Sequence, residues 1–195
     1  MAVVIFALLA LCAIALLLPI LGVTPPVKWG GQHSRSTWFS VEMMPPQYYT
    51  DTGQSLHGVY AHEHTHVLTD WMLGVFFMLL FAGVALAVFH DQLAVLAAVP
   101  GFLVAYKLSQ TDAWDRQSEL LAKTVEVEVA AKHGFDRDEY YQAESASTVA
   151  NVKVYGGILR PGETAAGFEA AMRRRAGLAR FLAALQAIPL RKVPA

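Results

Sequence analysis

The stretch "YAHEHTHVLTDWMLGVFFMLLFAGVALAVF", residues 60–89, joins a histidine-rich segment to a long apolar run. His62 and His66 are four residues apart, so on a helix they project from one face and can bind one metal ion together. Glu63 follows the first histidine and can accept a proton from water that the metal activates. His64 faces elsewhere on such a helix. The segment therefore predicts a metal site built on a helix.

The apolar run continues well past the histidines. Residues 71–89 carry no charge over nineteen positions, His90 and Asp91 interrupt, and residues 92–106 are again apolar. The first part is long enough to cross a bilayer as a helix, since about 20 apolar residues suffice. A two-residue turn suits an antiparallel pair of helices. Residues 71–106 are therefore predicted to form an apolar helical hairpin, which either spans a membrane or packs inside a helical core.

A second apolar segment occupies the N-terminus. Residues 1–23 contain no charged residue and consist almost entirely of Ala, Val, Leu, Ile and Phe. A secretory signal normally carries Lys or Arg before its apolar core, and none is present here. Residues 1–23 are therefore predicted to form a retained transmembrane anchor, with a cleaved signal as the alternative.

Composition supports membrane association. The 195 residues suit one domain, and they are 55% hydrophobic and only 16% charged, with a mean hydropathy of +0.38. Cys12 is the single cysteine, which excludes an intramolecular disulfide and a cysteine-rich zinc site. Thirteen of the fifteen Lys and Arg residues lie from Lys107 onward, but they are mixed with acids. This distribution is not typical of a nucleic-acid-binding protein.

The remaining segments predict a mainly α fold. Residues 24–58 are rich in Pro and Gly and are expected to form a loop, in which Ser36 to Met43 is the best candidate for a strand. That strand is either part of an ordinary surface loop or a short edge strand beside an active site. Amphipathic patterns and glycine or proline boundaries then predict three further helices, within residues 112–134, 136–157 and 161–186.

A catalytic zinc site needs a third protein ligand and one open position. The later histidines, His90 and His133, do not continue the histidine pattern. A carboxylate from the first helix after the hairpin is therefore the natural third ligand. The candidates are Glu119, Glu126 and Glu128. Glu119 and Glu126 are seven residues apart and share a helix face, whereas Glu128 points elsewhere.

The motif "HEHTH", the apolar pair and the later "SELLAKTVEVEVA" together resemble the gluzincin clan of zinc metallopeptidases. The layout is similar to integral-membrane heat-shock and prenyl-protein endopeptidases, and also to minimal gluzincin domains. The resemblance covers residues 59–135. It implies that Glu119, with a small residue three positions later at Ala122, is the third zinc ligand. It also implies gluzincin-like helices with the hairpin between the ligand halves, in a metallopeptidase-like domain of residues 59–195.

One position departs from this pattern. The larger family often has an acid directly after the small residue, where it supports a ligand histidine, and this chain has Lys123. Support for the histidine must then come from another residue, and Glu126 is the candidate for that role. The oxyanion of the reaction also needs a second donor. Four residues are candidates: His133, Tyr140, Tyr141 and Tyr155.

These observations predict a membrane-associated, zinc-dependent endopeptidase with a peptide or protein substrate. Two crossings by residues 71–106 return the chain to the side that it left, so His62, His66 and Glu119 lie on one side, as a single site requires. The excess of Lys and Arg after residue 107 favours the cytoplasmic side, which we expect to be that of a bacterial inner membrane. The alternatives are a non-catalytic membrane or phage assembly protein with a structural or degenerate metal site, and a membrane interaction protein without metal.

Overall fold

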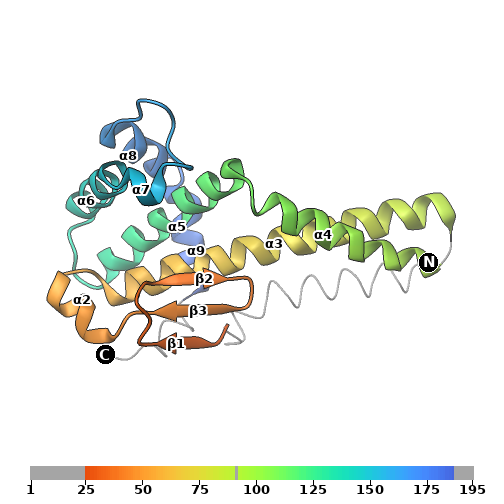
Figure 1. Ribbon diagram of the computed structural model, residues 1–195, viewed down its shortest axis with the longest axis horizontal. Helices are drawn as coiled ribbons and strands as arrows, with labels where there is room; N and C mark the ends of the chain where they lie inside the picture. The colour runs from red at the N-terminus through yellow and green to blue at the C-terminus, as the bar shows by residue number, and fades with distance from the viewer. Residues whose placement is uncertain (1–24, 91, 187–195) are drawn as a thin grey trace.

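The computed structural model describes residues 25–90 and 92–186, and it has two parts (Figure 1). The first part, here called the head (residues 25–70 and 109–186), contains a small sheet and most of the helices. The second part is a narrow helical hairpin (residues 71–108) that projects from the head. The predicted anchor, residues 1–23, and Asp91 of the predicted turn lie outside the described residues. The mainly α fold class is confirmed for the described part of the chain.

Helix α3 (Leu56–Phe89) joins the two parts without a break. It begins where the Ser55 hydroxyl accepts a hydrogen bond of 3.0 Å from the Gly58 amide, a common N-terminal cap. It ends at His90, whose backbone adopts the left-handed conformation with φ of 53°. The histidine motif and the first apolar run are therefore parts of one helix of 34 residues.

The second half of the hairpin is less regular. It consists of the 3₁₀ helix η1 (Gln92–Ala97) and helix α4 (Ala98–Leu108), which packs back against α3. Gly101 allows this close packing, because a Cβ atom there would lie only 2.4 Å from the carbonyl oxygen of Phe77. The predicted hairpin and the end of its first helix at His90 agree with the structure, whereas the 3₁₀ segment was not expected.

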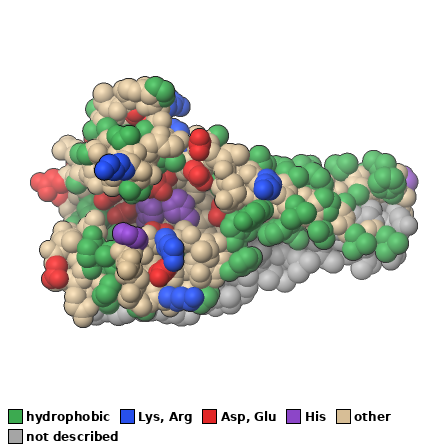
Figure 2. Space-filling model, viewed as in Figure 1, with side chains coloured by type: hydrophobic (Ala, Val, Ile, Leu, Met, Phe, Trp, Pro, Cys, Tyr) green, Lys and Arg blue, Asp and Glu red, His purple; other side chains and the backbone are tan. Residues whose placement is uncertain are grey.

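The hairpin exposes apolar side chains along most of its length. In the most apolar stretch of α3, only 17% of the residues are buried. Within the described residues, α3 is the one helix long and apolar enough to cross a membrane. Figure 2 shows hydrophobic side chains covering the projecting part. The exposed residues include Phe76, Leu80, Val84, Val88, Leu93, Leu96, Val99 and Leu103.

Residues 25–58 are more ordered than a loop. They form β1 (Val27–Trp29), β2 (Arg35–Thr37), β3 (Ser40–Met43) and helix α2 (Pro46–Thr52). The strand order is β1-β3-β2, with β1 parallel and β2 antiparallel to β3. The prediction of one strand over residues 36–43 was wrong, because a turn at Trp38 and Phe39 divides it. The prediction of an edge strand has a counterpart in β2, which lies at the edge of the sheet.

The head is organised around helix α5 (Asp112–Lys132). One core cluster lies between α5, α3, the sheet and helix α9 (Ala176–Leu185). A second lies between α5, helix α6 (Arg137–Ala150) and helix α8 (Ala165–Arg173). A short helix α7 (Val152–Tyr155) follows α6. The head thus buries both long faces of α5.

Two of the three predicted later helices are interrupted. The helix expected over residues 136–157 breaks at Asn151, which has a non-helical backbone between α6 and α7. The helix expected over residues 161–186 starts only at the Thr164 cap and breaks after α8. Between α8 and α9, the Arg175 guanidinium donates a hydrogen bond of 2.6 Å to the carbonyl of Ala171. One of the last carbonyl groups of α8 therefore has a hydrogen-bond partner.

Candidate metal centre

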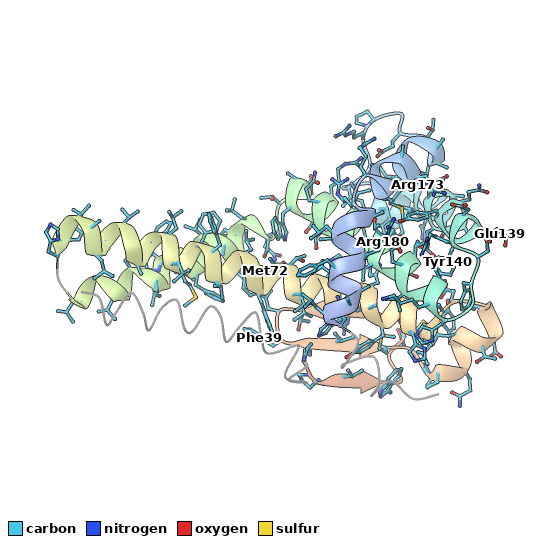
Figure 3. All side chains as sticks on the ribbon, turned by 180° about the vertical axis from the view of Figure 1, so that it is seen from behind. Phe39, Met72, Glu139, Tyr140, Arg173 and Arg180 are labelled. Atoms are coloured by element: carbon cyan, nitrogen blue, oxygen red, sulfur yellow. The ribbon has the colours of Figure 1, made fainter. Side chains whose placement is uncertain are left out.

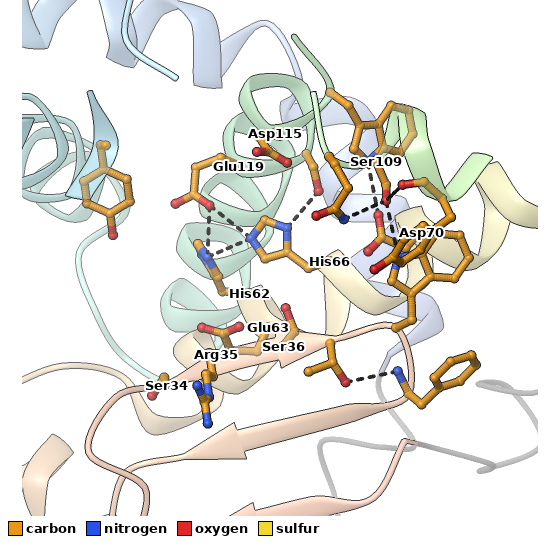
Figure 4. A pocket seen from close by; sticks show the side chains of 18 of the residues that line it. Ser34, Arg35, Ser36, His62, Glu63, His66, Asp70, Ser109, Asp115 and Glu119 are labelled. Atoms are coloured by element: carbon orange, nitrogen blue, oxygen red, sulfur yellow. Dashed lines mark hydrogen bonds and ion pairs between the residues drawn. The ribbon is translucent and has the colours of Figure 1, made fainter. Parts of the chain in front are cut away.

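The three predicted metal ligands meet where α3 crosses α5 (Figure 4). The Nε2 atoms of His62 and His66 are 3.2 Å apart. Glu119 Oε2 lies 3.0 Å from His66 Nε2 and 3.6 Å from His62 Nε2. One ligand atom from each of these residues falls within 4.8 Å of the other two, and among the described residues no other group of His, Cys, Asp or Glu does so.

Hydrogen bonds on the far side of His66 assign its tautomer. The Thr69 hydroxyl donates to the carbonyl of His66 at 2.9 Å, so the Ser118 hydroxyl must donate in its 3.0 Å contact with Thr69. With its proton used, Ser118 can only accept from His66 Nδ1, 2.8 Å away. The proton of His66 therefore resides on Nδ1, and its Nε2 presents a lone pair towards Glu119.

His62 is oriented in the same way by Glu126. The Nδ1 atom of His62 is 3.0 Å from Glu126 Oε2, and the other oxygen of Glu126 accepts a bond of 3.1 Å from Tyr140. A carboxylate accepts only, so His62 donates to Glu126 from Nδ1, and its Nε2 atom is the one that faces Glu119 and His66. Glu126 thus accepts from the outer nitrogen of His62, the position suggested for it in support of a ligand histidine, and it is not part of the ligand group.

Glu128, the third candidate ligand, faces the opposite side of α5. It is 2% exposed and contacts Tyr141, Arg137 and Arg180 at 3.4 to 3.5 Å. Its neighbours are therefore two basic side chains and a phenol, and none of them belongs to the metal centre.

Electrostatics favour a negatively charged Glu119. Burial alone would raise the pKa of Glu119, but His62, His66 and Lys123 together outweigh burial and hold that pKa well below its usual range. Burial alone would also lower the pKa of His62, but Glu119 and Glu126 raise it well above its ordinary value. In the metal-free centre a positive charge is therefore strongly favoured between these side chains.

Lys123 lies next to the centre and is 4% exposed. Its ammonium donates to Glu144 at 2.9 Å and lies 3.7 Å from Glu119 Oε1. Burial alone would lower the pKa of Lys123, but Glu144, Glu119 and Glu126 raise it well above its usual range. The departure from the gluzincin pattern therefore places a buried cation against the ligand carboxylate.

Glu63 lies between the ligand group and strand β2 (Figure 4). It is 7% exposed and lines the same cavity as the ligands. Burial raises the pKa of Glu63, with partial compensation from His62 and His66. Its carboxylate is thus more basic than an exposed one and is poised to accept a proton.

The four candidate oxyanion donors have different surroundings. Tyr155 lines the cavity with His62, Glu63, His66 and Glu119. Tyr140 is bound to Glu126, and Tyr141 is 3.4 Å from Glu128 on the far side of α5. His133 stacks on His57 with ring centroids 4.0 Å apart. Of these four residues, the structure therefore brings only Tyr155 to the cavity that contains His62, His66 and Glu119.

The centre lies in a cleft made of two adjoining cavities. One is about 720 Å³ and extends from the ligands along β2 to the base of the hairpin. The other is about 510 Å³, extends towards α6, and shares His62, Glu63 and Tyr155 with the first. The cleft therefore extends to both sides of His62 and Glu63.

Several functional neighbours have no signal in the sequence. Ser118 and Glu144 were not predicted, because neither belongs to a recognisable spacing pattern with the ligands. Trp114, which donates to Asp70 at 3.1 Å, and Trp38 also line the cleft. These residues are brought together by the crossing of α3, α5 and the sheet.

A zinc ion fits this donor set. Two imidazole nitrogens and one carboxylate are the usual ligands of a catalytic zinc. One oxygen of Glu119, Oε2, faces both Nε2 atoms, while Oε1 lies 3.7 Å from the Lys123 ammonium and makes no hydrogen bond.

No family model matches the chain, and comparisons with curated proteins and with solved structures found no match.

Proposed function

We propose that the protein is a membrane-associated, zinc-dependent endopeptidase. One observation carries the proposal: the Nε2 atoms of His62 and His66 and the Oε2 atom of Glu119 converge within 3.0 to 3.6 Å of one another. The raised pKa of His62 and the lowered pKa of Glu119 indicate that this group favours a positive charge, which a metal ion can supply in place of a proton. The outer nitrogens of the two histidines are held by Ser118 and Glu126, as is common for metal-binding histidines.

The residues around the centre support hydrolysis of a peptide bond. A bound zinc ion would act as a Lewis acid and lower the pKa of water at its open position. Glu63 accepts the proton of the attacking water and delivers it to the leaving amine. The Tyr155 hydroxyl donates to the carbonyl oxygen as negative charge develops there. His62, His66 and Glu119 would hold the zinc ion.

Strand β2 supports the binding of an extended peptide. It pairs with β3 on one side, and its other edge faces the cleft with Ser36 close to Glu63. A polypeptide can add to such an edge as a further strand, with backbone hydrogen bonds that do not depend on its sequence. This mode of binding suits an endopeptidase, because the chain continues in both directions.

The hairpin supports membrane association. Residues 71–89 extend for about 28 Å as a helix, close to the hydrocarbon thickness of a bilayer. Exposing side chains such as Phe76, Val84 and Val88 to water costs about 25 cal/mol per Å² of apolar surface. A bilayer around residues 71–106 removes that cost and leaves the centre on the side to which Lys107 and the later basic residues belong, which we infer to be cytoplasmic.

Purified protein in detergent is expected to hydrolyse casein only when it contains metal. A chelator should remove the activity, and stoichiometric zinc should restore it to within about twofold. The measurement is release of soluble peptides, with metal content followed by elemental analysis. Bound zinc without turnover would favour the non-catalytic alternative, and a protein without zinc would exclude both.

Cysteine labelling on intact membranes is expected to place the two ends of the hairpin on opposite sides of the membrane. In a background with Cys12→Ala, single cysteines at Asp51 and Ser147 should react with an impermeant maleimide from one side, and a cysteine at His90 from the other. All three positions are exposed, so failure to react would report the membrane and not burial in the fold. Labelling of all three from the same side would contradict a spanning hairpin.

A further inference from the structure

An apolar cavity of about 170 Å³ lies at the base of the hairpin, beside the catalytic cleft. Helix α3 contributes Gly74, Val75 and Met78 to it. Trp38, Phe39 and Phe102 line both this cavity and the cleft that contains the zinc ligands. The two spaces therefore adjoin, and only the aromatic side chains of these three residues separate them.

Trp38 forms the firmest part of the shared wall. Its indole nitrogen donates to the Ser109 hydroxyl at 3.3 Å, and its carbonyl accepts a hydrogen bond from Trp71. Its ring lies edge-on to Phe102 with centroids 5.1 Å apart. Gly74 makes room for this ring, because a Cβ atom there would lie 3.0 Å from it. Trp38, which follows β2, is thus fixed in place by contacts with both helices of the hairpin.

The opposite wall is more open. Phe39 is 66% exposed and lies where the sheet meets the hairpin (Figure 3). It follows Thr37 and Trp38, directly after the end of β2. A peptide that extends β2 as an additional strand therefore reaches Trp38 and Phe39 within one or two residues. Its next side chain on the hairpin side lies at the entrance of the cavity.

The size and lining of the cavity indicate what it can hold. Apolar cavities of about 150 Å³ stay dry and bind benzene, so there is room for one aromatic or branched side chain. A charged or amide side chain would lose its hydration without finding a partner among these residues. Alanine would leave most of the space empty.

We propose that this cavity is a specificity pocket that holds one bulky apolar residue of the substrate, such as Phe, Leu or Met, a few residues away from the bond that is cut. The inference rests on the proposed endopeptidase function, because it assigns a side-chain preference to the same cleft. The pocket is built from the hairpin as well as the sheet, so the segment that contacts lipid also selects the substrate.

The preference can be measured with zinc-loaded, full-length protein in detergent. A mixture of synthetic peptides first locates the cut bonds by mass spectrometry. Matched pairs that differ only in Phe or Ala at one position, about two to four residues from the cut bond, are then compared by kcat/KM. We expect the Phe peptide to be favoured by about 10- to 100-fold, as burial of one large side chain implies.

Val75→Trp fills the pocket and should abolish the preference, so that the Phe and Ala peptides are cut with equal kcat/KM. The matched control is Leu80→Trp, which adds the same side chain to an exposed position of α3 outside the cavity. Equal cutting of the two peptides by the wild type would overturn the proposal. An unchanged preference in Val75→Trp would overturn it as well.

A binding measurement separates this inference from the proposed catalysis. Fluorine NMR of N-acetyl-fluorophenylalanine amide should show line broadening with the wild type and with Leu80→Trp, but not with Val75→Trp. This pattern in a protein that cuts no peptide would refute the endopeptidase function and leave the pocket in place. Equal broadening with all three proteins would refute the pocket, for example because detergent or lipid chains occupy it.

Discussion

Replacing Glu63 with glutamine is expected to abolish hydrolysis while zinc remains bound. Glu63 is not part of the ligand group, so its loss removes no metal ligand. Its carboxylate is buried beside the ligands, where a proton acceptor is needed. General base catalysis contributes about 10²- to 10⁴-fold, so we expect the casein rate to fall by about that factor.

The Glu63→Gln variant tests the proton transfer alone, because glutamine has the same shape as glutamate. Burial already disfavours the charge of Glu63, so a neutral amide should not unfold the protein. Glu139→Gln is the matched control, because Glu139 is exposed on α6 and far from the cleft. Turnover retained by Glu63→Gln at the level of this control would exclude Glu63 as the base.

Replacing His66 with alanine is expected to remove the metal itself. His66 supplies one of the two imidazole nitrogens, and a centre reduced to His62 and Glu119 lacks the three protein ligands of a catalytic zinc. We expect the affinity for zinc to fall by more than about 100-fold, which exceeds the effect usual for a supporting residue. Elemental analysis after dialysis against a weak chelator measures the change.

Two further variants calibrate this loss. Ser118→Ala removes the hydroxyl that orients His66, so its affinity for zinc should fall by about 10- to 100-fold. His57→Ala changes a histidine of the same helix that stacks on His133 and lies outside the ligand group, so it should bind zinc like the wild type. Equal zinc in His66→Ala and the wild type would refute the centre.

The ligand pair could be predicted from sequence because its geometry is local. Four residues of helix are enough to bring His62 and His66 to one face. The third ligand depends on how α3 crosses α5, and spacing alone leaves Glu119 and Glu126 equivalent. The crossing separates them: Glu119 meets the Nε2 atoms, while Glu126, two turns later, meets the outer nitrogen of His62.

Other features depend on contacts that are remote in sequence. Lys123 pairs with Glu144 from α6, and Ser118 meets Thr69 from α3, so neither role leaves a pattern along the chain. The hairpin was predictable because nineteen uncharged residues and a short interruption are strong local signals. The sheet was mostly missed because its strands have three or four residues each, too few to show an alternating pattern.

The unbroken course of α3 makes the metal centre a fixed extension of the hairpin. From His66 to Phe89 the helix rises by about 35 Å, and no proline or kink separates the ligands from the apolar part. A helix longer than the local hydrocarbon layer tilts to fit it. In a thinner membrane, α3 would therefore lean and carry the mouth of the cleft closer to the lipid headgroups. In the proposed membrane orientation, bilayer thickness would thus set how far the cleft lies from the headgroups and the angle at which a substrate chain enters it.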